Sequence, residues 1–168
     1  MENRHFSLSV YFVRPRSLWD PYAWAIRLFI WAPYCHTAIG FSNKIFEAVG
    51  DGATWSTLKR FNAKNKTIAL FEIELSQAQH VKLLSLCKRI EKTPYDWRAI
   101  VNLAFYKLGL RPIYPDNGRK YLFCSELAFV ILQDLGLLPE GQKPDYMDPK
   151  RFLRYLEKAN DPAIIRIM

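Results

Sequence analysis

Three side chains of this sequence have the types that thiol catalysis needs: a cysteine, a histidine and a carboxylate. Cys124 stands in the segment Tyr-Leu-Phe-Cys-Ser-Glu-Leu, at the expected start of a strongly apolar helix. A thiol at a helix start lies near unpaired backbone amides and the positive end of the helix dipole, and both favour the thiolate. The same amides could donate to the oxyanion formed when a thiolate attacks a carbonyl. Because an isolated cysteine in such a helix is more often a small buried hydrophobe, Cys124 needs a partner base.

His36 is the candidate base, and Glu47 is the candidate for the group that orients it. His36 falls in one expected strand, and Glu47 falls between apolar neighbours in the next. A buried carboxylate is costly unless it has a partner. If the two strands pair, Glu47 can accept the second ring N–H of His36 and fix its tautomer. Each residue alone has a plainer interpretation, but with Cys124 they have the form of nucleophile, base and orienting group.

The elements that must position these residues can be predicted from periodicity, caps and turns. Alternation predicts strands over residues 6–13, 35–41, 44–49, 67–75 and 163–167. Cap residues and helical spacing predict helices over residues 21–31, 97–108 and 124–135, and a short one from 149. Another helix is expected between the cap Ser76 and the stop at Thr93-Pro94. Strands gather early and helices late, so we expect an α+β fold with an antiparallel sheet packed against helices. No repeat or linker interrupts the chain, which predicts a single domain over residues 1–168.

Composition narrows the classes of function. The net charge is +8, but the basic residues are scattered, so we favour a solvated surface over a nucleic-acid site. Nucleic-acid binding, for which the charge and the many aromatic side chains speak, is the third interpretation. No apolar run reaches about 18 residues, and the N-terminus lacks the features of a secretory signal, so we expect a cytoplasmic protein without a spanning helix. Cys35, Cys87 and Cys124 form an odd set without Cys-x-x-Cys spacing, which argues against a disulfide framework and a zinc site. We expect no metal and no cofactor.

Two segments carry a resemblance to a known family. They are CHTAIGF…IFEAVGDGATW and YLFCSELAFVIL, and they resemble the circularly permuted papain-like hydrolases of the NlpC-type superfamily. In that branch the histidine-bearing strand precedes the cysteine-bearing helix, whereas the unpermuted cell-wall peptidases have the opposite order. The likeness covers roughly residues 36–135, and shorter ones occur at residues 94–96 and 148–153. It implies a papain-like fold with Cys124 as nucleophile at a helix N-terminus, His36 as base and Glu47 as the third polar residue.

A related branch differs at two of these positions. The lecithin–retinol acyltransferase-like proteins share the order of the motifs, but their usual cysteine motif is Asn-Cys-Glu-His-Phe. They also carry a second histidine at the position of Glu47, whereas this chain has a carboxylate there. Lipid acyl transfer is therefore the second interpretation.

The prediction for function is a thiol hydrolase that cleaves an amide or ester through an acyl-enzyme on Cys124, with His36 as base. Peptide, isopeptide and cell-wall peptide amides are the first class of substrate, and lipid-linked amides and esters are the second. A lipid acyltransferase or phospholipase-like enzyme and a noncatalytic binding module on the same fold remain alternatives.

Several further residues receive smaller roles. Tyr95 is expected to contact substrate near the cleft, and Asp96 to cap the helix that follows it. Cys87 is assigned to helix packing, whereas Cys35 either tunes the site or packs behind it. A group of aromatic side chains could line an apolar groove, although packing into the core is favoured; its members are Trp19, Trp24, Trp31 and Tyr34.

Overall fold

A six-stranded sheet, with its strands in the order β4-β3-β2-β1-β5-β6, forms the middle of the structure. The computed structural model describes residues 6–17, 32–114, 119–139, 141–142, 144, 147–159 and 162–168. Each strand runs antiparallel to its neighbours. The strands are β1 Phe6–Pro15, β2 His36–Phe41, β3 Lys44–Val49, β4 Gly52–Thr57, β5 Asn65–Leu75 and β6 Ile164–Arg166.

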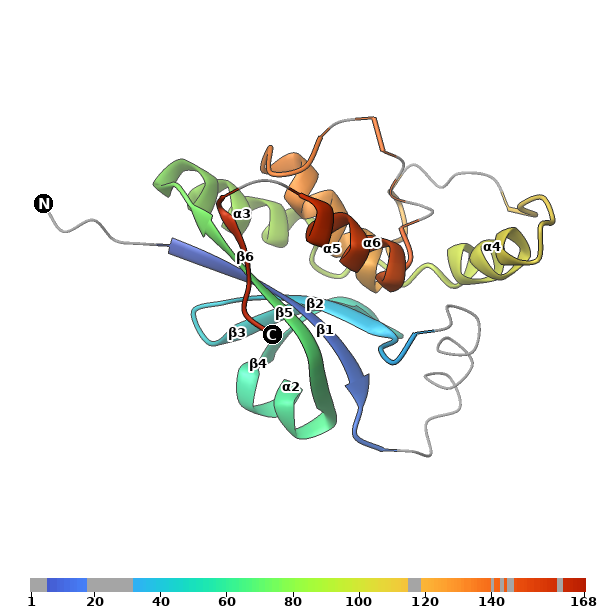
Figure 1. The fold of residues 1–168 in the computed structure, drawn as a ribbon, viewed down its shortest axis with the longest axis horizontal. Helices are drawn as coiled ribbons and strands as arrows, with labels where there is room; N and C mark the ends of the chain where they lie inside the picture. The colour runs from blue at the N-terminus through green and yellow to red at the C-terminus, as the bar shows by residue number, and fades with distance from the viewer. Residues whose placement is uncertain are drawn as a thin grey trace, which may run out of the picture.

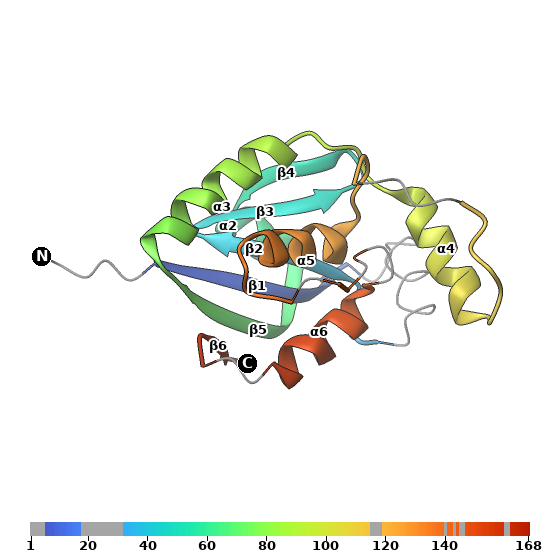
Figure 2. The ribbon, with the colours of Figure 1, turned by 90° about the horizontal axis from the view of Figure 1, so that it is seen from above.

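Helices cover both faces of this sheet. The described residues form α2 Leu58–Lys64, α3 Gln77–Ile90, α4 Trp97–Lys107, α5 Cys124–Asp134 and α6 Pro149–Lys158. Helices α3, α5 and α6 lie on one face, α2 lies on the other, and α4 projects away from both layers (Figures 1 and 2). The predicted α+β fold with an antiparallel sheet against helices is therefore confirmed.

The main core lies between the sheet and the layer of α3, α5 and α6. Phe12 of β1 reaches into it and meets Phe152 of α6, whose ring also contacts Phe129 of α5. Alternation sends the other side chains of β1 and β2 to the opposite face. There Val13 and Ala38 form a smaller core with Phe61 of α2.

Local sequence accounts for most element boundaries. Ser76 begins α3 with a capping box shared with Gln79. Asp148 accepts a hydrogen bond from the backbone of Arg151 at 2.9 Å and so caps α6. The turn between β2 and β3 places both Ser42 and Asn43 at positive φ, the conformation that two-residue hairpins favour.

The structure differs from the sequence-based prediction at the end of β1 and between residues 52 and 64. Strand β1 runs on to Pro15, where we expected it to end at residue 13; Pro15 is the last residue of the strand, a position at which a missing N–H does little harm. Strand β4 and helix α2 were not predicted, because the alternation of Ala53 and Trp55 with Thr54 is short and directly follows a turn. The helix predicted over residues 21–31 lies outside the described residues, as do Trp19, Trp24 and Trp31.

Candidate active site

The N-terminus of α5 positions Cys124. Phe123 takes the N-cap place in extended conformation, and its own N–H donates to the Glu126 carboxylate at 3.3 Å. The Ser125 N–H, one residue into the helix, donates to the Cys124 sulfur. Cys124 is buried, and so is every following residue of α5 up to Leu132. The nucleophile candidate therefore stands at the end of a helix that the core holds on all sides.

His36 and Glu47 come from neighbouring strands. His36 opens β2, and the register of Ile39 with Phe46 brings Glu47 level with Ala38, two residues beyond His36 on the same face. The Nε2 atom of His36 lies 2.7 Å from Oε2 of Glu47. The two side chains are 18% and 11% exposed, so solvent still reaches part of the pair. With Nε2 used in this way, Nδ1 is the ring atom left for Cys124.

Ser56 is a member of this group that the sequence interpretation missed. Its hydroxyl donates to Oε1 of Glu47 at 2.9 Å. Glu47 pairs with Thr54 of β4, and Ser56 follows two residues later on the same face. Both carboxylate oxygens of Glu47 are thus hydrogen-bonded, which fixes the plane of the carboxylate that holds His36. The alternation of Thr54 and Ser56 with Ala53 and Trp55 was the available signal.

Electrostatics favour a thiolate at Cys124. Burial alone would raise the pKa of the thiol. The hydrogen bond and charge of His36 act in the opposite direction, as do the backbone N–H groups of Thr37 and Ser125, and the pKa of Cys124 falls below its usual value. This is the combination that makes a cysteine reactive near neutral pH.

The pKa values of His36 and Glu47 shift in the directions that favour their charged forms. Burial disfavours the charged form of His36, but hydrogen bonds to Cys124 and Glu47 outweigh it and raise the pKa of the imidazole. Burial would raise the pKa of Glu47, yet His36, the Ser56 hydroxyl and the charge of Lys64 together lower it. The preferred state is therefore a thiolate, an imidazolium and a carboxylate in one chain of contacts. Such a chain supplies a nucleophile and a proton donor together.

Tyr95 lies beside the sulfur. A parallel bridge between Tyr95 and Leu122 ties the segment before α4 to the segment before α5. The Tyr95 hydroxyl hydrogen-bonds with Cys124. Burial, followed by the negative charge of Cys124, holds the pKa of Tyr95 well above its usual value. The hydroxyl therefore stays protonated and can donate a hydrogen bond. Asp96 accepts a hydrogen bond from Ala99 N–H at 2.8 Å, which confirms the predicted cap.

The remaining predicted residues lie in the interior. None of the three cysteines forms a disulfide. Cys87 packs in the main core from α3, and burial raises the pKa of its thiol to about 12. Cys35 is buried next to the site, with its N–H donating to the carbonyl of Val13 at 3.0 Å. Tyr34 lies in the core with its ring in edge contact with Phe12.

Comparison with solved structures supplies one neighbour. No protein-family model matches the chain, and no curated protein matches it. The crystal structure of the metalloprotein yiiX from Escherichia coli O157:H7, described as DUF1105, superposes with a TM-score of 0.62 at 17% sequence identity. The match covers 97% of this chain and 96% of that one.

The name of that neighbour raises the question of a metal site in this chain. Among the described residues, no group of three or more His, Cys, Asp or Glu side chains could hold a metal ion. The same part contains no helix long and apolar enough to cross a membrane. What the chain shares with yiiX is the fold.

Proposed function

We propose that the protein is a thiol hydrolase that cleaves an amide or ester bond through an acyl-enzyme on Cys124. The observation that carries the proposal is the chain of contacts from Cys124 through His36 to Glu47, with 2.7 Å between the last two side chains. A cysteine that only fills space has no need of a histidine held by a carboxylate. The lowered pKa of Cys124 and the raised pKa of His36 support the same reading.

The residues of the site divide the reaction between them. The Cys124 thiolate attacks the carbonyl carbon, and the carbonyl electrons move to the oxygen. The Ser125 N–H and the Tyr95 hydroxyl, both of which hydrogen-bond with the sulfur in the resting state, are available to the oxyanion. When the tetrahedral adduct collapses, His36 protonates the departing amine or alcohol. His36 then takes a proton from water, which attacks the thioester and releases the acid and the thiolate.

Glu47 and Ser56 act on His36 rather than on the substrate. The Glu47 carboxylate stabilises the imidazolium and aims the ring, and Ser56 holds the carboxylate. We further propose that this arrangement belongs to the permuted papain-like type. A histidine strand followed by a nucleophile helix, on an antiparallel sheet backed by helices, supports that assignment.

The pH dependence of cysteine alkylation tests the proposal. The three thiols are mapped by mass spectrometry after a brief exposure to a small alkylating reagent. A free cysteine has a pKa of about 8.5. Because the pKa of Cys124 is lowered, this thiol is expected to react at a pH well below that value. Cys87 serves as the internal control and should react slowly, since its pKa is about 12.

The variant His36→Gln tests whether His36 lowers the pKa of Cys124. It removes the hydrogen bond and the charge that lower the pKa of Cys124, so the midpoint of Cys124 alkylation should move to higher pH. Hydrolysis of soluble acyl esters and peptide amides is then measured with Cys124→Ala as the blank. The proposal would be contradicted if Cys124 reacted no faster than Cys87. It would also be contradicted if the pH profile of Cys124 alkylation were the same in His36→Gln and in the wild type.

A further inference from the structure

An apolar surface on α4 and the loop after it faces solvent instead of the core. Trp97 and Val101 lie one turn apart on the outer side of the helix, and Leu108 continues the stripe at its C-terminal end. Trp97 is 48% exposed and Leu108 is 69% exposed. The α4 outer surface, as we call it, consists of Trp97, Val101, Leu108, Leu110, Ile113 and Tyr114.

The loop half of this surface is held in place by hydrogen bonds. Oδ1 of Asn102 accepts the N–H groups of Ile113 and Tyr114, each at 3.0 Å. Nδ2 of Asn102 donates to the carbonyl of Tyr114 at 2.9 Å. The guanidinium of Arg98 also lies 5.6 Å from the centre of the Tyr114 ring. The loop that carries the apolar side chains of Ile113 and Tyr114 is therefore fixed to α4 by hydrogen bonds.

The inner side of α4 connects this surface to the candidate nucleophile. Ala99 and Leu103 of α4 form a small core with Phe123 and Cys124. Tyr95, whose hydroxyl hydrogen-bonds with Cys124, lies two residues before the helix. Helix α4 extends beyond the sheet and the other helices (Figures 1 and 2). Helix α4 therefore lies between its outer surface and the candidate site.

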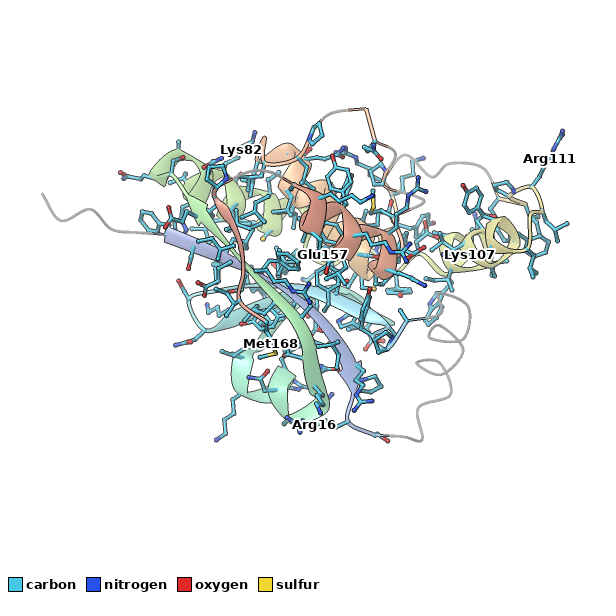
Figure 3. The ribbon with its side chains drawn as sticks, in the orientation of Figure 1. Arg16, Lys82, Lys107, Arg111, Glu157 and Met168 are labelled. Carbon is cyan, nitrogen blue, oxygen red and sulfur yellow. The ribbon has the colours of Figure 1, made fainter. Side chains whose placement is uncertain are left out.

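The charged side chains within the segment that forms this surface are all basic. Between residues 97 and 114 the sequence contains Arg98, Lys107 and Arg111 and no Asp or Glu. Lys107 contacts Asp148 at 2.9 Å, whereas Arg111 extends outward from the far end of α4 (Figure 3). Exposed apolar side chains with basic neighbours are the pattern by which helices bind anionic lipid surfaces. Pairing two copies through this face would bring Arg98 and Arg111 toward their own counterparts, which like charges disfavour.

We propose that the α4 outer surface docks on a membrane that contains anionic lipids. The membrane contact follows from the surface alone. On the membrane, Trp97 and Leu108 enter the interface while Arg98 and Arg111 meet the headgroups.

Vesicle sedimentation of the Cys124→Ala protein tests the contact without turnover. Vesicles of phosphatidylcholine with phosphatidylglycerol should bind the protein, and vesicles of phosphatidylcholine alone should bind it far less. The triple variant Val101→Ser, Leu108→Ser, Ile113→Ser should reduce binding about tenfold or more. Its matched control is Val81→Ser, Leu84→Ser, which removes two exposed apolar side chains from α3 and should leave binding unchanged.

The charges are tested in the same way. Arg98→Gln, Arg111→Gln should weaken binding by about fivefold for each charge removed, and added salt should weaken the wild type similarly. The control Lys82→Gln, Lys88→Gln removes two charges from α3, on another part of the molecule (Figure 3). Equal losses in variant and control, or no preference for anionic vesicles, would overturn the membrane contact. A wild-type dimer that the triple variant dissociates would assign the surface to a second copy instead.

Discussion

Helices α5 and α4 have the same length of eleven residues and are both rich in apolar side chains, yet they meet opposite environments. In α5 every residue from Cys124 to Leu132 is buried. In α4 the buried residues are Ala99 and Leu103. The difference arises because α5 lies between the sheet and its flanking helices, whereas α4 rests on the rest of the structure by one side. Apolar content alone therefore does not tell where a helix lies.

The two environments suit two roles. A helix packed on all sides holds its first residue at a fixed distance from the sheet, as a nucleophile beside a strand histidine requires. A helix packed on one side leaves its other face for a partner. The Lys107–Asp148 ion pair and the Ala99 and Leu103 contacts keep α4 attached to the site that it flanks.

The strongest test of the contrast is made at the first residue of α5. Cys124→Ala should reduce turnover by at least about 10⁴-fold, because no other group can form the acyl-enzyme, while the free energy of unfolding changes little. Cys87→Ala is the matched change in α3 and should destabilise the core without reducing turnover. Activity assays and denaturant unfolding of both variants provide the check. Residual turnover in Cys124→Ala close to that of the wild type would contradict the assignment.

The packing contrast is tested by one substitution in each helix. Phe129→Ala in α5 should destabilise the protein by about 3–5 kcal/mol, since the ring is buried against Phe152 and Tyr155. Val101→Ala on the outer side of α4 should change stability by no more than about 0.5 kcal/mol. Urea unfolding monitored by circular dichroism measures both. Similar losses for the two variants would mean that the outer side of α4 is packed in solution.

A smaller effect is expected where the strands orient the base. Glu47→Gln removes the carboxylate charge that raises the pKa of His36, so that pKa should fall. Because the proposed reaction uses protonated His36 beside a thiolate, the alkaline limb of the pH–rate profile should move to lower pH. Turnover at neutral pH should fall about 10–100-fold. Ser56→Ala should lower turnover about threefold to tenfold. A pH–rate profile of Glu47→Gln that overlays the wild type would exclude Glu47 from the orienting role.

Much of the local structure could be predicted from sequence because its signals are short-range. Ser76, Asp96 and Asp148 have side chains that favour the N-cap position of a helix. In the structure each of them caps the helix that follows it. Strand β4 and helix α2 were missed, since their signals are weak without the neighbouring strand β3. Ser56 was missed with them, because its role depends on the register of β4 against Glu47.

The sequence by itself determined the residue types of the candidate site, the helix that begins at Cys124 and the strands that carry His36 and Glu47. It also determined that the segment from Trp97 to Tyr114 carries basic but no acidic side chains. Only the tertiary structure decided that Ser56 completes the site, that Tyr95 reaches the sulfur and that α4 leaves an apolar face uncovered. Caps and periodicities act over a few residues, whereas strand register and helix burial depend on contacts between residues far apart in the chain, which no local pattern encodes.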